Sequence, residues 1–269
     1  MAETFLILLA GGVMLAAAVS NPADVTLNWL RLAGILALCM FGLGMVFYVW
    51  RPPAVEMAPV MRRVQVGLLV ATGVCVLGQL AFVQMAWRRT QRLLAAAAFV
   101  IAVLAAVNVL HELMTPSGVA VRFRPKVLAM GLQTVSCAGV AAMTGLALMD
   151  MLLGHAYLTA SKMTIAPFRR LNLALAGTLG LRVVTAVGVV LLVQRRQPVE
   201  MLWPVHGLYV LTRWFVGLVV PAVFVYMAHD CVRRRSTQSA TGILYVAGVL
   251  IFLGELVALY LLRETGLPF

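Results

Sequence analysis

The sequence predicts an all-α fold, a polytopic integral membrane bundle of about eight transmembrane helices. The chain has 269 residues, of which 63% are hydrophobic and 11% are charged, whereas a soluble domain is about half apolar and a quarter charged. Its apolar residues are gathered in runs of about 20, the length that an α-helix needs to cross a bilayer. These runs lack the alternation of barrel strands, and only helices and closed barrels satisfy the backbone in lipid.

The expected spans follow one another with short connections. They cover about 4–20, 26–50, 64–86, 93–113, 127–153, 171–194, 206–229 and 241–262. Turn residues such as Asn21-Pro22 and Arg51-Pro52-Pro53 stand between them. No connection is long enough for a soluble domain, so residues 1–269 are expected to form a single transmembrane domain. The first run lacks the basic n-region of a signal peptide, and we expect it to be a retained span.

The formal net charge of +12 indicates membrane topology rather than nucleic acid. The basic residues stand between apolar runs, where they orient spans and meet lipid headgroups. We call the side that holds residue 1 face A and the other side face B. Lys and Arg are spread evenly over both faces, and Arg31 tips the balance towards a cytoplasmic face B. The expected location is the bacterial inner (plasma) membrane, with both chain ends outside.

Cysteine chemistry is not expected to contribute to function. Three of the four cysteines fall inside apolar runs, and none belongs to a Cys-x-x-Cys pair; the four are Cys39, Cys75, Cys137 and Cys231. This pattern is typical of small buried hydrophobic residues.

Three charged residues lie inside expected spans. Arg182 is central in the sixth, Arg213 lies a turn or two inside the seventh, and Glu255 lies within the eighth. A bare charge there costs about 2.5–3.5 kcal/mol on insertion scales, so pairing or hydration is expected. Glu255 is therefore expected near Arg213 or Arg182. Two readings stay open: a structural ion pair between helices, or a proton path, an anion path or the polar wall of a quinone pocket.

All four histidines stand at span ends. Alternation of the spans places His111 and His206 on face A, and His155 and His229 on face B. Imidazoles from two helices can clamp a haem iron, so one pair on each face predicts a haem b site as one hypothesis. Histidine also tolerates the membrane interface without any ligand, and that reading stays open.

Acidic residues accompany the histidines of face B. Asp150 lies near His155 in "MDMLLGHAYLTASK", and Asp230 follows His229. Imidazole and carboxylate together can hold a divalent metal or relay protons. The second hypothesis is a metal or proton site made of Asp150, His155, His229 and Asp230. We also expect Gly154 to be able to end the helix before His155.

Other features concern packing. Ala176 and Gly180 have the small-xxx-small spacing that permits close helix approach. Pro221 is expected to kink the seventh span. The stretch "LNWLRLAGIL" at Leu27 faintly echoes "LNLALAGTL" at Leu171, as four-plus-four parallel repeats would, although residues this common also match by chance.

These observations leave three classes of function open. The first is a hydrophobic subunit of a redox or energy-converting assembly that contacts haem or quinone. The second is a small-solute or ion transporter, and the third is a structural or assembly membrane protein. No catalytic motif is present, so enzymatic activity of the chain on its own is not expected. The expected partners are membrane lipid and other membrane subunits, and nucleic acid is not among them.

Overall fold

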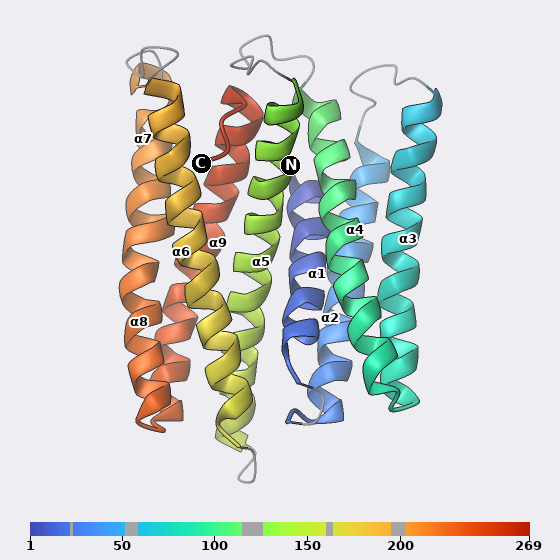
Figure 1. The fold of residues 1–269 in the computed structure, drawn as a ribbon, viewed down its shortest axis with the longest axis vertical. Coiled ribbons are helices and arrows are strands. Elements are labelled where there is room, and N and C mark those ends of the chain that lie inside the picture. Colours follow the sequence, from blue (N-terminus) through green and yellow to red (C-terminus); the bar gives the residue numbers. More distant parts are fainter. Residues whose placement is uncertain (22–23, 52–58, 115–125, 160–163, 195–202) are drawn as a thin grey trace.

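The computed structural model describes residues 1–21, 24–51, 59–114, 126–159, 164–194 and 203–269, and every regular element within them is a helix. The chain order is α1 (Ala2–Val19), α2 (Leu27–Trp50), α3 (Pro59–Gln84), α4 (Arg88–Met114), α5 (Lys126–Thr159), α6 (Ala166–Gln194), α7 (Trp203–Trp214), η2 (Phe215–Val219), α8 (Val220–Arg233) and α9 (Thr237–Thr265). The helices stand side by side with alternating direction (Figure 1).

The predicted fold class is confirmed. Eight helical segments of the described chain are long and apolar enough to cross a membrane, with α7, η2 and α8 together forming the seventh. The longer helices extend a few residues beyond the apolar runs, because the polar residues that flank these runs are also helical. The chain is therefore an integral membrane protein with an all-α bundle fold.

The eight spans divide into two halves with the same packing order. In the first half α1 packs on α2, α2 on α3, α3 on α4, and α4 returns to α1; α5, α6, α8 and α9 repeat this order. In Figure 1, α4 lies in front and α2 behind on one side, while α6 lies in front and α9 behind on the other. An approximate two-fold axis along the helices, between α1 and α5, produces this arrangement.

Burial repeats in the same way. The apolar stretches of α1 and α5 are 78% and 72% buried, those of α4 and α9 are 50% and 44%, and the four remaining spans are each 28% buried. Equivalent spans in the two halves thus have equivalent surroundings. The faint echo between Leu27 and Leu171 falls on α2 and α6, which occupy equivalent positions.

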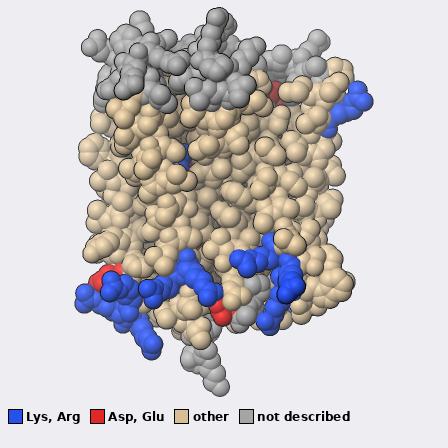
Figure 2. Space-filling view, in the orientation of Figure 1, with Lys and Arg blue, Asp and Glu red and all other residues tan. Residues whose placement is uncertain are grey.

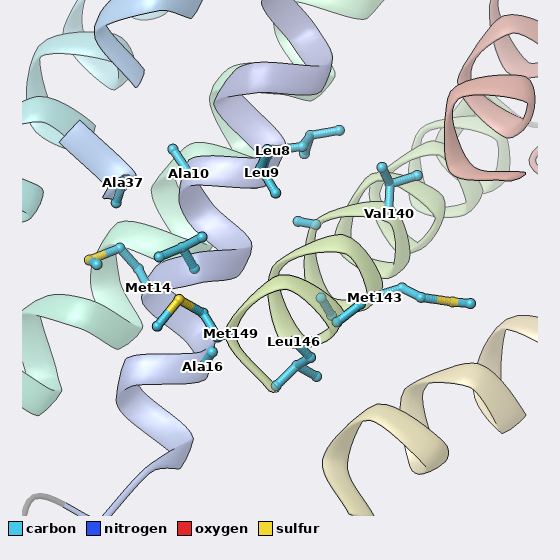
Figure 3. Packing of buried hydrophobic residues seen from close by; sticks show 14 of the residues in the cluster. Leu8, Leu9, Ala10, Met14, Ala16, Ala37, Val140, Met143, Leu146 and Met149 are labelled. Atoms are coloured by element: carbon cyan, nitrogen blue, oxygen red, sulfur yellow. The ribbon is translucent and has the colours of Figure 1, made fainter. Parts of the chain in front are cut away.

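The two halves meet along a seam between α1 and α5, where the buried Met149 of α5 lies beside the buried Ala16 of α1 (Figure 3). The backbones cross at Gly12 and Gly145. A Cβ atom at Gly12 would lie 1.8 Å from the carbonyl oxygen of Ala141, and one at Gly145 would lie 1.9 Å from the carbonyl carbon of Gly12. Only glycine fits at this crossing, because the backbones are already in contact.

The small-residue pair predicted in the sixth span does not serve this purpose. Gly180 is exposed on α6, and a Cβ there would meet no atom within 4 Å. The close approaches are instead Gly12 with Gly145 and Gly217 with Gly254. Spacing alone was misleading here, because small residues recur throughout these helices and the motif does not say which face meets a neighbour.

The seventh span is interrupted at mid-length. Residues 215–219 form a π-helical turn, and the backbone N–H of Val220 donates to the carbonyl of Phe215. Pro221 follows directly and has no N–H to donate to an earlier carbonyl. The expected irregularity at Pro221 is thus a π-turn just before it, and such turns are frequent at functional sites.

The outer surface fits a lipid environment. Uncharged residues, many of them exposed apolar side chains, cover the wall seen in Figure 2, and basic residues gather at its face B end. Exposed tryptophans stand near both edges, with Trp50 at the end of α2 and Trp87 just before α4. Aromatic residues at both edges are typical of membrane interfaces.

Candidate functional site

Three buried charged residues meet inside the second half of the bundle. The Nε and Nη2 atoms of Arg182 donate to the two carboxylate oxygens of Glu255 at 3.2 and 2.6 Å. Nη1 of Arg213 donates to Glu255 Oε1 at 3.0 Å. All three side chains are at most 2% exposed. The structure therefore places Glu255 between both arginines, with each residue supplied by a different span.

The cluster, which we call the arginine–glutamate triad, carries one excess positive charge. Two guanidinium groups face a single carboxylate, and Arg remains protonated in proteins. A fourth helix contributes a neutral group, because Arg182 Nη1 donates to the hydroxyl of Ser136 on α5 at 3.3 Å. Burying net charge is costly in lipid. One bound monovalent anion would balance the excess positive charge of the triad.

Arg213 has unused hydrogen-bond donors. Its Nη1 binds Glu255, while Nε and Nη2 are buried without a partner. These two N–H groups form one edge of the guanidinium plane, the same edge with which Arg182 holds Glu255 at both oxygens. This edge matches a planar carboxylate in bidentate geometry.

Glycines make room for the triad. A Cβ at Gly139 would lie 2.5 Å from Cδ of Arg182, and a Cβ at Gly217 would lie 3.2 Å from Nη1 of Arg213. Gly217 also meets Gly254, because a Cβ at Gly254 would lie 2.2 Å from Cα of Gly217. The π-turn therefore touches α9 one residue before Glu255.

A pocket of about 140 Å³ adjoins the triad between α5 and α6. Ser136 and Thr185 provide its hydroxyl groups, and the rest of the wall is mainly apolar, with Leu132, Val135, Gly188, Val189 and Pro268. Ser136 is also the residue that holds Arg182. A solute in the pocket is thus separated from a buried guanidinium by one hydroxyl group.

The first half carries a shallower counterpart near face A. Arg51, just after α2, pairs with Glu3 on α1 and with Glu112 on α4. Gln65 on α3 donates to Glu112 at 3.4 Å. In each half, an arginine of the second span (α2 or α6) thus pairs with a glutamate of the fourth span (α4 or α9). The first and third spans of that half add further polar groups. The difference is depth, because the second-half cluster lies inside the spans.

The four residues predicted to form a site on face B lie in different environments. Asp150 is fully buried on α5, and its Oδ2 accepts from Nδ2 of Asn172 on α6 at 3.2 Å. His229 on α8 contacts Oδ1 of the same Asn172 through Nδ1 at 3.0 Å. His155 is exposed, and Asp230 forms a surface ion pair with Arg234. Asn172 thus joins Asp150 to His229 and leaves the other two outside.

Gly154 does not end the helix, contrary to the expectation. Helix α5 continues to Thr159. A Cβ at Gly154 would lie 2.6 Å from Oγ1 of Thr241, so this glycine serves close packing against α9. His155 is five positions after Asp150 on a continuous helix, which corresponds to a rotation of about 140°. This rotation explains why the carboxylate is buried while the imidazole is exposed.

The two histidines of face A have separate surroundings. His111 is exposed on α4. His206 on α7 packs edge-on against Tyr260 of α9, with ring centroids 6.3 Å apart. Within the described residues, no three His, Cys, Asp or Glu side chains are grouped as a metal site would require. Asp150, His155, His229 and Asp230 therefore do not form one ligand set.

Sequence reasoning missed the neutral members of both clusters. Ser136, Gly139 and Asn172 occur in apolar runs and have no distinctive spacing. Asn172 and Ser136 are nearly or fully buried polar residues, and polarity within a span is the signal that would have found them. Comparison with protein-family models, with curated proteins and with solved structures finds no match.

Proposed function

We propose that the protein is a membrane carrier for a small organic anion, a short or aromatic monocarboxylate, in the bacterial inner membrane. The observation that carries this proposal is the arginine–glutamate triad, with its excess positive charge and the unpartnered edge of Arg213. Binding one monovalent anion would neutralise the cluster and satisfy the two free donors.

The adjoining pocket supports this class of solute. Its volume of about 140 Å³ is close to that of an apolar cavity of about 150 Å³ that holds benzene. Its apolar wall suits a hydrocarbon tail, and Ser136 marks the end that leads to Arg182. A carboxylate entering there meets Arg182 first. The free edge of Arg213 becomes a second donor pair when the helices move apart during alternating access.

The architecture also favours transport. Parallel repeats related by an axis along the membrane normal occur in transporters, which use interrupted helices at their binding sites near mid-membrane. Here the interrupted seventh span supplies Arg213 directly before its π-turn. The haem form of the redox-subunit hypothesis depended on paired imidazoles, and the four histidines have separate surroundings. The anion carrier is therefore the function that the geometry favours.

Thermal unfolding of the purified protein in lipid nanodiscs tests the proposal. A ligand that binds only the folded state raises stability with its concentration. Benzoate and propionate should raise Tm, whereas benzyl alcohol should not, because it lacks the charge. Chloride and phosphate separate general anion binding from carboxylate recognition. Equal responses to benzoate and benzyl alcohol would refute the proposal.

Variants of Arg213 sharpen this test. Arg213→Gln removes the excess charge and should abolish the benzoate response. Arg213→Lys keeps the charge but loses the bidentate edge, so it should lose the preference for benzoate over chloride. The matched control is Arg63→Gln, on the exposed start of α3, which should respond as the wild type does. Counterflow of labelled benzoate in proteoliposomes should follow the same order among the variants.

A further inference from the structure

We propose that Asp150, Asn172 and His229 form a proton-binding site with access from face B, in which Asn172 couples the protonation of Asp150 to the tautomer of His229. This site is separate from the anion pocket. Asp150 lies 14 residues from Ser136 on α5, about 21 Å at 1.5 Å per residue, and Asn172 lies 10 residues from Arg182 on α6, about 15 Å.

Asp150 has the surroundings of a protonatable group. It is fully buried in a membrane-spanning helix, and its Oδ1 has no hydrogen-bond partner. Asn172, also fully buried, provides the one side-chain donor that contacts it in the described structure. No cation pairs with Asp150 in the part of the chain that the structure describes. An ionisable residue placed so in a membrane indicates function by default.

The charged groups of the neighbouring helices have other partners or are exposed. Arg170 on α6 pairs with Asp24, and Arg234 on α8 pairs with Asp230. Arg92 on α4 donates to the carbonyl of Ala18. The remaining groups at this end of those helices are exposed or half-buried: Arg88, Arg89, His155, Tyr157, Arg169, Tyr226, Cys231, Arg233 and Tyr245. The lower half of α1 has no titratable residue.

The amide of Asn172 links the two ends of the site. In the arrangement observed, its Nδ2 donates to Asp150 and its Oδ1 must accept from Nδ1–H of His229, because a carbonyl oxygen only accepts. This arrangement fits an ionised Asp150. When the proton is on Oδ2 of Asp150, that O–H donates instead to Oδ1 of Asn172, so the amide turns over and its Nδ2 donates to a bare Nδ1 of His229. The proton of the imidazole then resides on Nε2. A proton on Oδ1 of Asp150 would be a buried donor without an acceptor in the described structure.

A proton on Oδ2 of Asp150 therefore selects a different His229 tautomer from the one that the ionised carboxylate selects. In both states all three side chains keep their shared hydrogen bonds, and intermediate combinations leave two donors or two acceptors facing each other. His229 is half-buried near the face B end of α8, whereas Asp150 is fully buried. Protons from face B thus reach the site at the imidazole end.

Infrared and nitrogen-15 NMR titrations of the full-length protein in nanodiscs test the coupling. The carboxylic C=O band of protonated Asp150 should disappear as pH rises, and Asp150→Asn should lack that band at every pH. Over the same pH interval, the imidazole proton of His229 should move from Nε2 to Nδ1. Asn172→Leu should separate the two transitions, and His229→Gln should abolish the imidazole signal of the transition.

The matched control is His155→Gln, an exposed histidine at the same end of the bundle, which should leave both transitions joined. Two results would overturn the proposal: a carboxylic band absent or unchanged over the accessible pH range, or transitions that stay joined in Asn172→Leu. Neither measurement uses transport, so failure of the anion-carrier proposal would leave this one standing, and the reverse also holds.

Discussion

At the scale of single residues, Glu255 sets the charge balance of the second half. It accepts from both arginines, and all three groups are buried. Removing one partner of a buried ion pair strands the other charge, which can cost about 3–5 kcal/mol. Because there are two arginines and one glutamate, neutralising Glu255 doubles the excess positive charge, whereas neutralising one arginine removes it.

Neutralising Glu255 should therefore be far more damaging than neutralising Arg213. Glu255→Gln leaves two adjacent guanidinium groups uncompensated, and we expect a loss of stability of about 3–5 kcal/mol. Arg213→Gln leaves the neutral Arg182–Glu255 pair and should fold at a yield near that of the wild type. Adding Arg213→Gln to Glu255→Gln should recover part of the lost yield. Size-exclusion profiles after membrane extraction measure this order, and equal yields for all variants would contradict it.

The glycine crossing makes a second prediction at this scale. Gly12→Ala places a methyl group against the backbone of α5, where no flexible side chain can move aside. The helices must separate, so Tm should fall markedly, with a loss of several kcal/mol in line with overpacking at a rigid contact. Gly180→Ala is the matched control, because its Cβ position is open. A Gly12→Ala protein as stable as the control would show that the seam is looser than described.

At the scale of elements, the π-turn decides which residues of the seventh span share a face. Arg213 and His229 are 16 residues apart, about 160° around a regular α-helix. A π-turn absorbs one extra residue, which reduces the angle to about 60°. Arg213 can thus reach α9 while His229 reaches α6, and both point into the same half.

Deletions of one residue test this role. Deleting Val216 removes the extra residue of the π-turn and leaves both flanking helices facing the interior, so folding should survive. Deleting Val223, an exposed residue of α8, shortens the span equally but turns the two flanks by about 100° relative to each other. That variant should be recovered at much lower yield. Protease resistance and extraction yield compare the two, and equal loss in both would rule out the register argument.

At the scale of the whole molecule, each half is a four-helix ring, and the halves join mainly through α1 and α5. The main apolar core nevertheless runs from α1 to α9, and a smaller cluster contains Val189, Leu261, Leu267 and Phe269. The division explains how one protein can hold a deep charged cluster in one half and a shallow one in the other. The halves share a packing scheme but not the depth of their polar residues.

The halves should therefore assemble from separate chains. Residues 1–114 and 126–269, co-expressed with a tag on the first, should co-purify through the α1–α5 seam. Gly145→Val in the second chain should prevent co-purification, whereas Gly188→Val, at a position with open space, should not. Independent purification of both chains without association would contradict this view of the architecture.

The topology of the whole chain can be tested separately. Reporter fusions after Arg92, Arg170 and Arg235 should all report one face, and fusions after Arg63, Lys126 and Arg196 the other. Alternation of the eight helices requires this division, and a mixed result within either set would contradict it. A cytoplasmic location for the first set is the expected orientation.

The sequence by itself determined the fold class, the eight spans and the three charged residues of the triad. Lipid requires long apolar helices and makes each charge within them conspicuous, so composition and run length carried this information. Tertiary structure alone decided which polar groups meet. Asp150 and Asn172 are 22 residues apart, and Arg182 and Glu255 are 73 apart, so their contacts depend on helix rotation and neighbour order. Small residues and histidines recur too often for their spacing to reveal which of them face a neighbouring helix. Only the packing of the helices decides this, as at the crossing of Gly12 with Gly145.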